Sequence, residues 1–225
     1  MPGAHDAISA RLIARAGFKA YFIGGFPLVG ARYGLPDVGL AALGEIAAGV
    51  RDIMAACDHP LPVLVDGDTG HGNFNNVRRF VRKLCERGLA GVCIEDKLFP
   101  KTNSFIGEAQ PLADTEEFCG RIKAGKDSQT DDDFVLVARV EALISGLGME
   151  EALRRAEAYH QAGADAILIH SKKPTADEIL AFAGRWGGRA PLVIVPTAPT
   201  PAPTAARPSS SDPDGPVVTR PQPLD

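Results

Sequence analysis

Acidic side chains stand close together at two points of the sequence, each directly after a short apolar run. Asp66 and Asp68 lie two residues apart in a D-G-D-T-G run, and Glu95 and Asp96 follow the next apolar run. Carboxylate oxygens are the ligands that Mg²⁺ and Mn²⁺ prefer in proteins. Asp66 or Asp68 could instead form a turn or cap a helix. The recurrence of acids after the second run favours a metal site.

A polar loop and two basic side chains add groups that suit an anion. Residues 97–104 follow the second acidic pair without a helical pattern, and they could close over a ligand and exclude water. Arg139 and His170 follow later apolar runs and supply a cation and a neutral donor for carboxylate or phosphate oxygens. A buried structural role for His170 stays open. Together these groups suit a small anionic substrate that reacts through an enolate or a transferring phosphoryl group.

Short apolar runs predict the strands that position these residues. Each run is almost continuously hydrophobic and is bounded by polar residues or glycine, which is typical of parallel strands covered on both faces. The runs are Ala20–Ile23, Val63–Val65, Gly91–Ile94, Phe134–Val137, Ala166–Ile169 and Leu192–Val195. Candidate chemical residues follow several of them directly.

Helical patterns separate the predicted strands. Apolar residues recur at helical spacing within residues 74–84 and 153–159. Asp114 with Glu117, and Thr175 with Glu178, match the capping-box pattern that begins a helix. Strand–helix units that repeat with parallel strands define an α/β fold.

The position of the polar residues selects one form of this fold. In a (β/α)8 TIM-type barrel, the carboxyl ends of the strands converge on the active site. An open doubly wound sheet would also bind ligands at these ends, but the sequence contains no G-x-G-x-x-G or Walker run. We therefore predict a β/α barrel catalytic domain over residues 1–197.

The composition after Thr197 differs from that of the predicted barrel. Residues 198–225 contain eight prolines among 28 residues and few large apolar side chains. Such a segment buries too little surface to offset its ordering entropy, so we predict a proline-rich disordered tail. Because it directly follows the last predicted strand, the barrel is expected to be incomplete, without a last strand and terminal helices.

The overall composition excludes several classes of protein. The 225 residues are 45% hydrophobic and 23% charged, as in globular proteins, and the net charge of −4 argues against a nucleic-acid partner. No apolar run reaches the length of a membrane-spanning helix. Four dispersed cysteines predict free thiols, and the start of the sequence does not match a secretory signal, so we expect a cytoplasmic protein.

Four segments form motifs that match a known family. They are D-G-D-T-G-H-G-N at 66–73, I-E-D-K-L-F-P-K-T-N-S at 94–104, A-R-V-E-A at 138–142 and H-S-K-K at 170–173. These segments resemble the isocitrate lyase/phosphoenolpyruvate mutase superfamily, and within it phosphoenolpyruvate mutase most closely. The resemblance extends from about Pro2 to Thr197, and the E-D-K-x-F-P-K-x-N-S run is highly specific to this family. The family has further chain before Met1 and beyond Thr197, which again implies a barrel that is incomplete at both ends.

What the resemblance implies is an isomerase of phosphonate biosynthesis. Such an enzyme interconverts phosphoenolpyruvate and phosphonopyruvate with Mg²⁺, with Mn²⁺ as a second option, and a complete barrel would form a homodimer or homotetramer. The resemblance also implies that Asp66 binds the metal directly, that Asp68 and Glu95 hold its waters, and that Asp37 supports the site.

The resemblance assigns the remaining roles to a gating loop and to substrate-binding residues. Lys101, Asn103 and Ser104 would lie on the loop, with Asn103 touching the phosphoryl group. Arg139 and His170 would hold substrate oxygens. A loose phosphoryl transition state needs positioning and charge neutralisation more than a strong base, which agrees with this set of residues.

One segment departs from the mutase pattern. Residues 22–27 read F-I-G-G-F-P, whereas mutases have a W-G-S-G-L type run that cradles substrate. Gly24, Gly25 and Phe26 are therefore candidate substrate-binding residues, and a related phosphonate or carboxyphosphonate is an alternative substrate.

Three other functions stay open. A phosphonopyruvate hydrolase resembles the mutase but varies the K-x-N-S segment, which this chain keeps. A carbon–carbon lyase of the 2-methylisocitrate type has a loop cysteine where this chain has Asn103. An inactive, truncated homologue is the third alternative, since an open barrel would expose strand edges and apolar surface and could be unstable.

Overall fold

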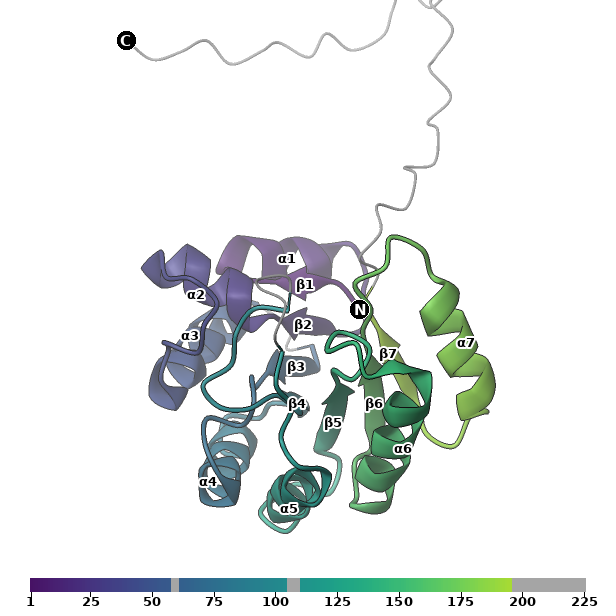
Figure 1. The fold of residues 1–225 in the computed structure, drawn as a ribbon. Coiled ribbons are helices and arrows are strands. Elements are labelled where there is room, and N and C mark those ends of the chain that lie inside the picture. The colour runs from purple at the N-terminus through teal and green to yellow at the C-terminus, as the bar shows by residue number, and fades with distance from the viewer. Residues whose placement is uncertain (58–60, 105–109, 196–225) are drawn as a thin grey trace, which may run out of the picture.

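The computed structural model describes residues 1–57, 61–104 and 110–195, and within them seven parallel strands form one curled sheet (Figure 1). The strands are β1 (Gly3–Ala4), β2 (Tyr21–Ile23), β3 (Val63–Asp66), β4 (Gly91–Glu95), β5 (Val135–Val140), β6 (Ala166–Ile169) and β7 (Leu192–Ile194). Each strand pairs with the next strand in the chain. The predicted tail, residues 198–225, and Thr197 lie outside the described residues.

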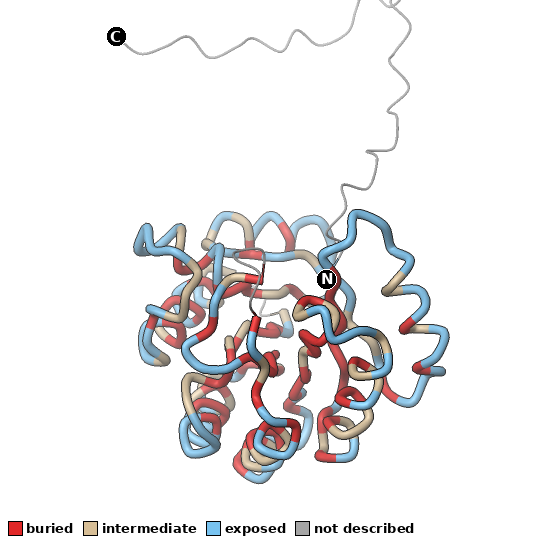
Figure 2. Tube along the Cα trace, viewed as in Figure 1, coloured by how far each residue is buried: buried red, intermediate tan, exposed pale blue. Residues whose placement is uncertain are grey.

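The helices lie on the outer side of the curled sheet, as Figure 1 shows. They are α1 (Ala7–Arg15), α2 (Gly25–Tyr33), α3 (Leu43–Ala55), α4 (Phe74–Cys85), α5 (Thr115–Lys126), α6 (Gly148–Gln161) and α7 (Asp177–Trp186). Buried residues lie on their inward faces and exposed residues face outward (Figure 2). Parallel strands in chain order, surrounded by helices, confirm the predicted barrel-type α/β fold.

The register of the sheet places the chemical residues on the inner face. Asp66 pairs with Cys93, which is two residues before Glu95, and Glu95 pairs with Arg139. Arg139 in turn pairs with Leu168, two residues before His170. Because alternate residues of a strand face the same side, Asp66, Glu95, Arg139 and His170 all point into the curled sheet.

An apolar layer lies beneath this polar layer. It is a cluster separate from the main core between helices and strands, and it consists of Leu64, Cys93, Val137, Ala166 and Leu168, with Phe22 and Val193 against it. Leu64, Cys93, Val137 and Leu168 each stand two residues before one of the inward-facing chemical residues. Each of these strands therefore contributes first to an apolar floor and then to the site above it.

The helix predicted after Thr175 is present, but its predicted capping box is wrong. Helix α7 begins at Asp177 after Ala176, which makes no side-chain cap. Thr175 donates to the Asp177 carboxylate at 2.9 Å, and Glu178 accepts from Ser171 at 2.5 Å. The Ser171 hydroxyl therefore binds the Glu178 carboxylate that the capping box would need. By contrast, Asp114 caps α5 as predicted by accepting from two backbone N–H groups, although Glu117 of the predicted capping box accepts from Arg121 at 2.8 Å.

Two global expectations can be compared with the described residues. No helix described in the structure is both long enough and apolar enough to cross a membrane. Cys57, Cys85, Cys93 and Cys119 are free thiols, as the sequence predicts.

Candidate active site

A cavity of about 320 Å³ opens at the carboxyl ends of the strands. All predicted site residues except Gly25 and Asp68 line it. The predicted residues in its wall are Gly24, Phe26, Asp37, Asp66, Glu95, Lys101, Asn103, Ser104, Arg139 and His170. Phe22, Pro27, Cys93 and Leu168 add an apolar side. The structure thus brings together groups that the sequence spreads over almost 150 positions.

The turn after β3 fixes Asp66 by hydrogen bonds to both carboxylate oxygens. Asp68 N–H donates to Oδ1 at 3.0 Å, and Gly25 N–H donates to Oδ2 at 3.1 Å. A Cβ on Gly25 would lie 3.2 Å from both Asp66 Oδ2 and Asp68 Oδ1, so a residue without a side chain suits this position. From α5, Arg121 donates to the carbonyl of Thr69 at 2.9 Å and supports the same turn. Gly25 and Asp68 therefore belong to the site although they do not line the cavity.

The Lys101 ammonium lies among the acids. Its Nζ is 2.6 Å from Asp68 Oδ1 and 2.8 Å from Asp37 Oδ1, and the lysine side chain is only 6% exposed. Burial alone would lower the pKa of Lys101, but the charges of Asp66, Glu95, Asp68 and Asp37 outweigh it and raise the pKa. Lys101 is therefore a permanent cation in this site.

The three predicted metal-binding carboxylates have different protonation equilibria. Burial and the nearby charge of Asp66 raise the pKa of Asp68 to about 6. Burial raises the pKa of Glu95 to about 7, although Arg139 and Lys101 oppose the change. For Asp66, burial is outweighed by Lys101, Arg139 and two backbone N–H groups, so its pKa is lowered. Asp66 is thus the carboxylate best kept ionised.

The donor set fits a hard divalent cation. The carboxylates of Asp66, Asp68 and Glu95 come from two neighbouring strand ends, and Glu95 Oε1 is buried without a hydrogen-bond partner among the described residues. Carboxylate oxygens with room for water are the usual environment of Mg²⁺. The described residues contain no ready-made group of three acids, histidines or cysteines that could hold a metal ion. The Lys101 ammonium instead contacts Asp68.

The loop after β4 reaches into the site and is held there by Asp37. Asn103 Nδ2 donates to Asp37 Oδ2 at 2.9 Å, while Lys101 pairs with the other oxygen of the same carboxylate. Asp37 therefore fixes two loop side chains at once. Ser104, the third predicted loop residue, is buried and donates to Glu141 Oε2 at 2.9 Å.

Arg139 connects the strand ends to one another. Its Nη1 is 3.4 Å from Glu95 Oε2, and its Nη2 is 3.1 Å from His170 Nδ1. Because a guanidinium can only donate, the contact with His170 requires an unprotonated Nδ1 and places the ring proton of a neutral His170 on Nε2. His170 then offers an N–H donor from the ring nitrogen opposite Arg139.

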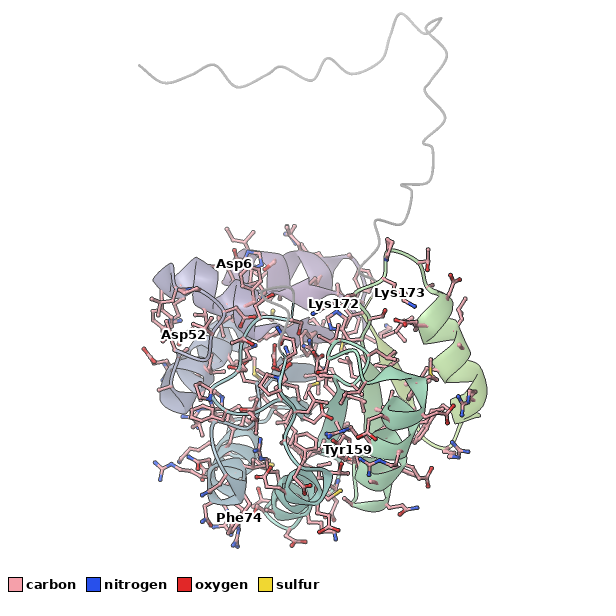
Figure 3. The ribbon with its side chains drawn as sticks, viewed as in Figure 1. Asp6, Asp52, Phe74, Tyr159, Lys172 and Lys173 are labelled. Carbon is pink, nitrogen blue, oxygen red and sulfur yellow. The ribbon has the colours of Figure 1, made fainter. Side chains whose placement is uncertain are left out.

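Sequence reasoning misplaced one acid and left two charged residues without a role. Asp96, considered with Glu95 as an oxygen ligand, instead accepts from Tyr159 and Arg155 of α6 at 2.6 and 3.1 Å. Tyr159 is labelled in Figure 3. Lys97 and Glu141 form a buried ion pair of 3.3 Å beside the cavity. Strand alternation is the signal that separates these acids, since Asp96 follows the inward-facing Glu95 by one position and Glu141 follows Arg139 by two.

Comparison with known families assigns this chain. A family model described as phosphoenolpyruvate phosphomutase matches residues 1–209. The chain belongs to the phosphoenolpyruvate phosphomutase family. It is 51% identical over 195 residues to a phosphoenolpyruvate phosphomutase from Streptomyces hygroscopicus, covering 87% of this chain and 62% of that protein. The chain thus spans less than two thirds of the length of this relative.

Solved structures of the phosphoenolpyruvate phosphomutase family and its relatives share the fold. A phosphoenolpyruvate phosphomutase from Streptomyces platensis subsp. rosaceus superposes with a TM-score of 0.83 at 47% identity, covering 87% of this chain and 67% of that one. A phosphonopyruvate hydrolase solved with oxalate and Mg²⁺ has a TM-score of 0.80 at 43% identity, with 88% and 67% covered. The resemblance noted in the sequence is confirmed at the level of the family.

Proposed function

We propose that this protein interconverts phosphoenolpyruvate and phosphonopyruvate in a Mg²⁺-dependent reaction. The observation that carries the proposal is the arrangement of one cavity. Asp66 of the acidic turn (residues 66–70), Glu95, Arg139, His170 and the loop residue Asn103 all line it. Membership of the phosphoenolpyruvate phosphomutase family supports the same activity.

Asp66 would bind the metal directly, and Asp68 and Glu95 would hold its coordinated waters. Bound Mg²⁺ would supply positive charge to neutralise the oxygens of the substrate and of its enolate form. The lowered pKa of Asp66 supports a direct role, because a ligand must be deprotonated. Lys101 must then share the acidic cluster with a divalent ion, and Asp37 supplies a second carboxylate for its ammonium.

Arg139 and His170, at the ends of β5 and β6, would orient the substrate. The guanidinium pairs with carboxylate or phosphoryl oxygens, and the Nε2–H of His170 adds a neutral donor. Asn103 would contact the phosphoryl group during its transfer. In phosphoryl transfer, positioning and charge neutralisation provide most of the catalysis, and this arrangement provides both.

The apolar side of the cavity would determine which substrate fits. A Cβ at Gly24 would lie 3.0 Å from the ring of Pro27, so this chain combines a glycine with a proline ring in its wall. Phe26 also lines the cavity. We propose that Gly24, Gly25 and Phe26 shape the substrate pocket. A homo-oligomeric state and a cytoplasmic location stay predictions from the sequence.

Phosphonopyruvate hydrolysis is the second candidate, favoured by the similarity to a phosphonopyruvate hydrolase at 43% identity. The two reactions differ in the acceptor of the phosphoryl group, which is the enolate in the mutase and a water molecule in the hydrolase. The loop favours the mutase, because this chain keeps the K-x-N-S run that hydrolases vary, and Lys101 and Asn103 of that run line the cavity.

Incubation with phosphonopyruvate and Mg²⁺, followed by ³¹P NMR, separates the candidates. The mutase reaction produces a phosphoenolpyruvate resonance, and we expect this result. Inorganic phosphate as the initial product would establish the hydrolase instead. An unchanged spectrum would contradict both, and turnover of 2-methylisocitrate would then support the lyase.

A further inference from the structure

One fully buried carboxylate connects the substrate-binding wall to the loop. We propose that Glu141 is a positioning residue. It aligns Arg139 and His170, and it couples their orientation to the position of Ser104 in the loop after β4. Glu141 does not line the cavity, but four residues that do line it surround its carboxylate. The inference rests on the proposed function, since it assigns a task within the same site.

The first oxygen of Glu141 faces the substrate-binding residues. Oε1 accepts from Arg139 Nε at 2.5 Å and is 3.4 Å from His170 Nδ1. A charge-assisted bond of this kind fixes the plane of the guanidinium. Arg139 can then direct Nη2 at His170 and Nη1 at Glu95. Glu141 therefore sets the direction of both groups that would hold substrate oxygens.

The second oxygen of Glu141 faces the loop. Oε2 accepts from Ser104 Oγ at 2.9 Å and is 3.3 Å from Lys97 Nζ. Lys97 in turn donates to Ser104 Oγ at 2.6 Å and to the carbonyl of Thr102 at 3.0 Å. Arg139 also donates to Ser104 Oγ at 3.2 Å. Glu141 and its two cations therefore hold Thr102 and Ser104 of the loop, in addition to the contacts that Asp37 makes with Lys101 and Asn103.

The backbone of Glu141 is anchored independently of the site. Its N–H donates to Asp96 Oδ1 at 2.9 Å. The other Asp96 oxygen accepts from Tyr159 and Arg155 of α6. This support from the helix layer leaves the Glu141 carboxylate little freedom to move. Removing its charge would leave half-buried Arg139 and buried Lys97 without their shared partner, which is costly in a site with little solvent.

Substitutions at Glu141 test the proposal in the full chain. Glu141→Gln keeps the shape of the side chain and removes its charge, while Glu141→Asp keeps the charge and withdraws it from its partners. We expect both variants to reduce kcat/KM for phosphonopyruvate by about 100-fold, because small displacements of aligned groups have effects of this size. The matched control is Glu150→Gln. Glu150 pairs with Arg185 on the outer surface and should be kinetically silent.

Native trypsin cleavage after Lys101 measures the loop without substrate. Lys101 is buried in the seated loop, so cleavage requires local opening. We expect Glu141→Gln to increase this cleavage about tenfold, because one lost charge-assisted bond changes the open population by that factor. Cleavage after Arg121 in α5 should not change. A loss of overall stability alone would accelerate cleavage at both positions.

Several outcomes would overturn the proposal. An equal rate of cleavage after Lys101 in Glu141→Gln and in wild type would show that Glu141 does not hold the loop in its buried position. Full activity of Glu141→Asp would show that a negative charge at residue 141 is sufficient for catalysis even when the carboxylate is withdrawn from Arg139 and Ser104. If Glu141→Gln does not fold, Ser104→Ala removes only the bridging hydroxyl, and unchanged cleavage there would also contradict the proposal. A wild type without turnover would refute the proposed function and leave the cleavage test intact.

Discussion

At the residue scale, the site depends on buried charges that share partners. Asp37 holds Lys101 with one oxygen and Asn103 with the other, and Glu141 is placed in the same way between Arg139 and Ser104. Each carboxylate therefore couples a loop residue to a second charged or polar group. Such pairs are costly to break, because the remaining charge is left in a low dielectric.

The pairing of Glu141 predicts a specific pH dependence of stability. Burial opposes ionisation, but the charges of Arg139 and Lys97 outweigh it and lower the pKa of Glu141 below its ordinary value of 4.5. A carboxyl group with a lowered folded-state pKa stabilises the protein above its unfolded-state pKa and loses this contribution as the pH falls. The difference in unfolding free energy between wild type and Glu141→Gln should shrink by about 1 kcal/mol from pH 4.5 to 3.5.

Urea unfolding at a series of pH values measures this difference. Glu150→Gln provides the control: Arg185 also lowers the pKa of Glu150, but this carboxyl group is exposed, so solvent screens the pair and the pH dependence should be much smaller. A difference that stays constant, or that grows as the pH falls, would contradict the pairing of Glu141 in the folded protein.

At the element scale, the sequence predicted the strands well and the first helices poorly. Six strands occur within two or three residues of their predicted bounds, because buried parallel strands leave continuous apolar runs. Strand β1 has two residues and no pattern to detect. Helices α1, α2 and α3 were not predicted, and in α2 three of nine residues are glycine or proline, which obscures the helical signal.

The candidate site was predictable where it depends on strand ends. Asp66, Glu95, Arg139 and His170 follow apolar runs, and the register then brings them to one face. Contacts made across loops were not predictable in this way. The pairing of Asp37 with Asn103 spans 66 positions and depends on how the loop folds back, which no local pattern specifies.

The acidic turn requires glycine at Gly67, which yields a test of how this element positions the site. A Cβ there would lie 2.8 Å from Phe80 Cε1 and Val92 Cγ2, so Gly67→Ala overpacks the junction of β3, β4 and α4. We expect a loss of about 1–3 kcal/mol of stability together with weaker Mg²⁺ binding.

Thermal unfolding and calorimetric Mg²⁺ titration check this prediction. The matched control is Gly184→Ala at an exposed position of α7, where a Cβ would meet no atom within 4 Å. That change should stabilise the protein by about 0.5–1 kcal/mol through helix propensity and leave metal binding unchanged. Wild-type stability and metal affinity in Gly67→Ala would show that the turn is less tightly packed than described.

At the scale of the whole molecule, the curled sheet converts a repeated strand pattern into a single site. In strands β3 to β6, an apolar residue of the floor precedes a chemical residue by two positions. Sequential parallel pairing then arranges these residues around one cavity. The chain spans 62% of the length of its Streptomyces hygroscopicus relative, yet the described residues contain every predicted site residue.

The central claim is that phosphoryl migration occurs at the acidic turn, and the rate of phosphoenolpyruvate formation in Asp66→Asn tests it most directly. Asp52→Asn is the control, because Asp52 lies on α3 at the outer surface and pairs with exposed arginines (Figure 3). With phosphonopyruvate and Mg²⁺ followed by ³¹P NMR, we predict that Asp66→Asn slows the reaction at least about 100-fold and that Asp52→Asn does not. Phosphoenolpyruvate formation at the wild-type rate in Asp66→Asn would contradict the account.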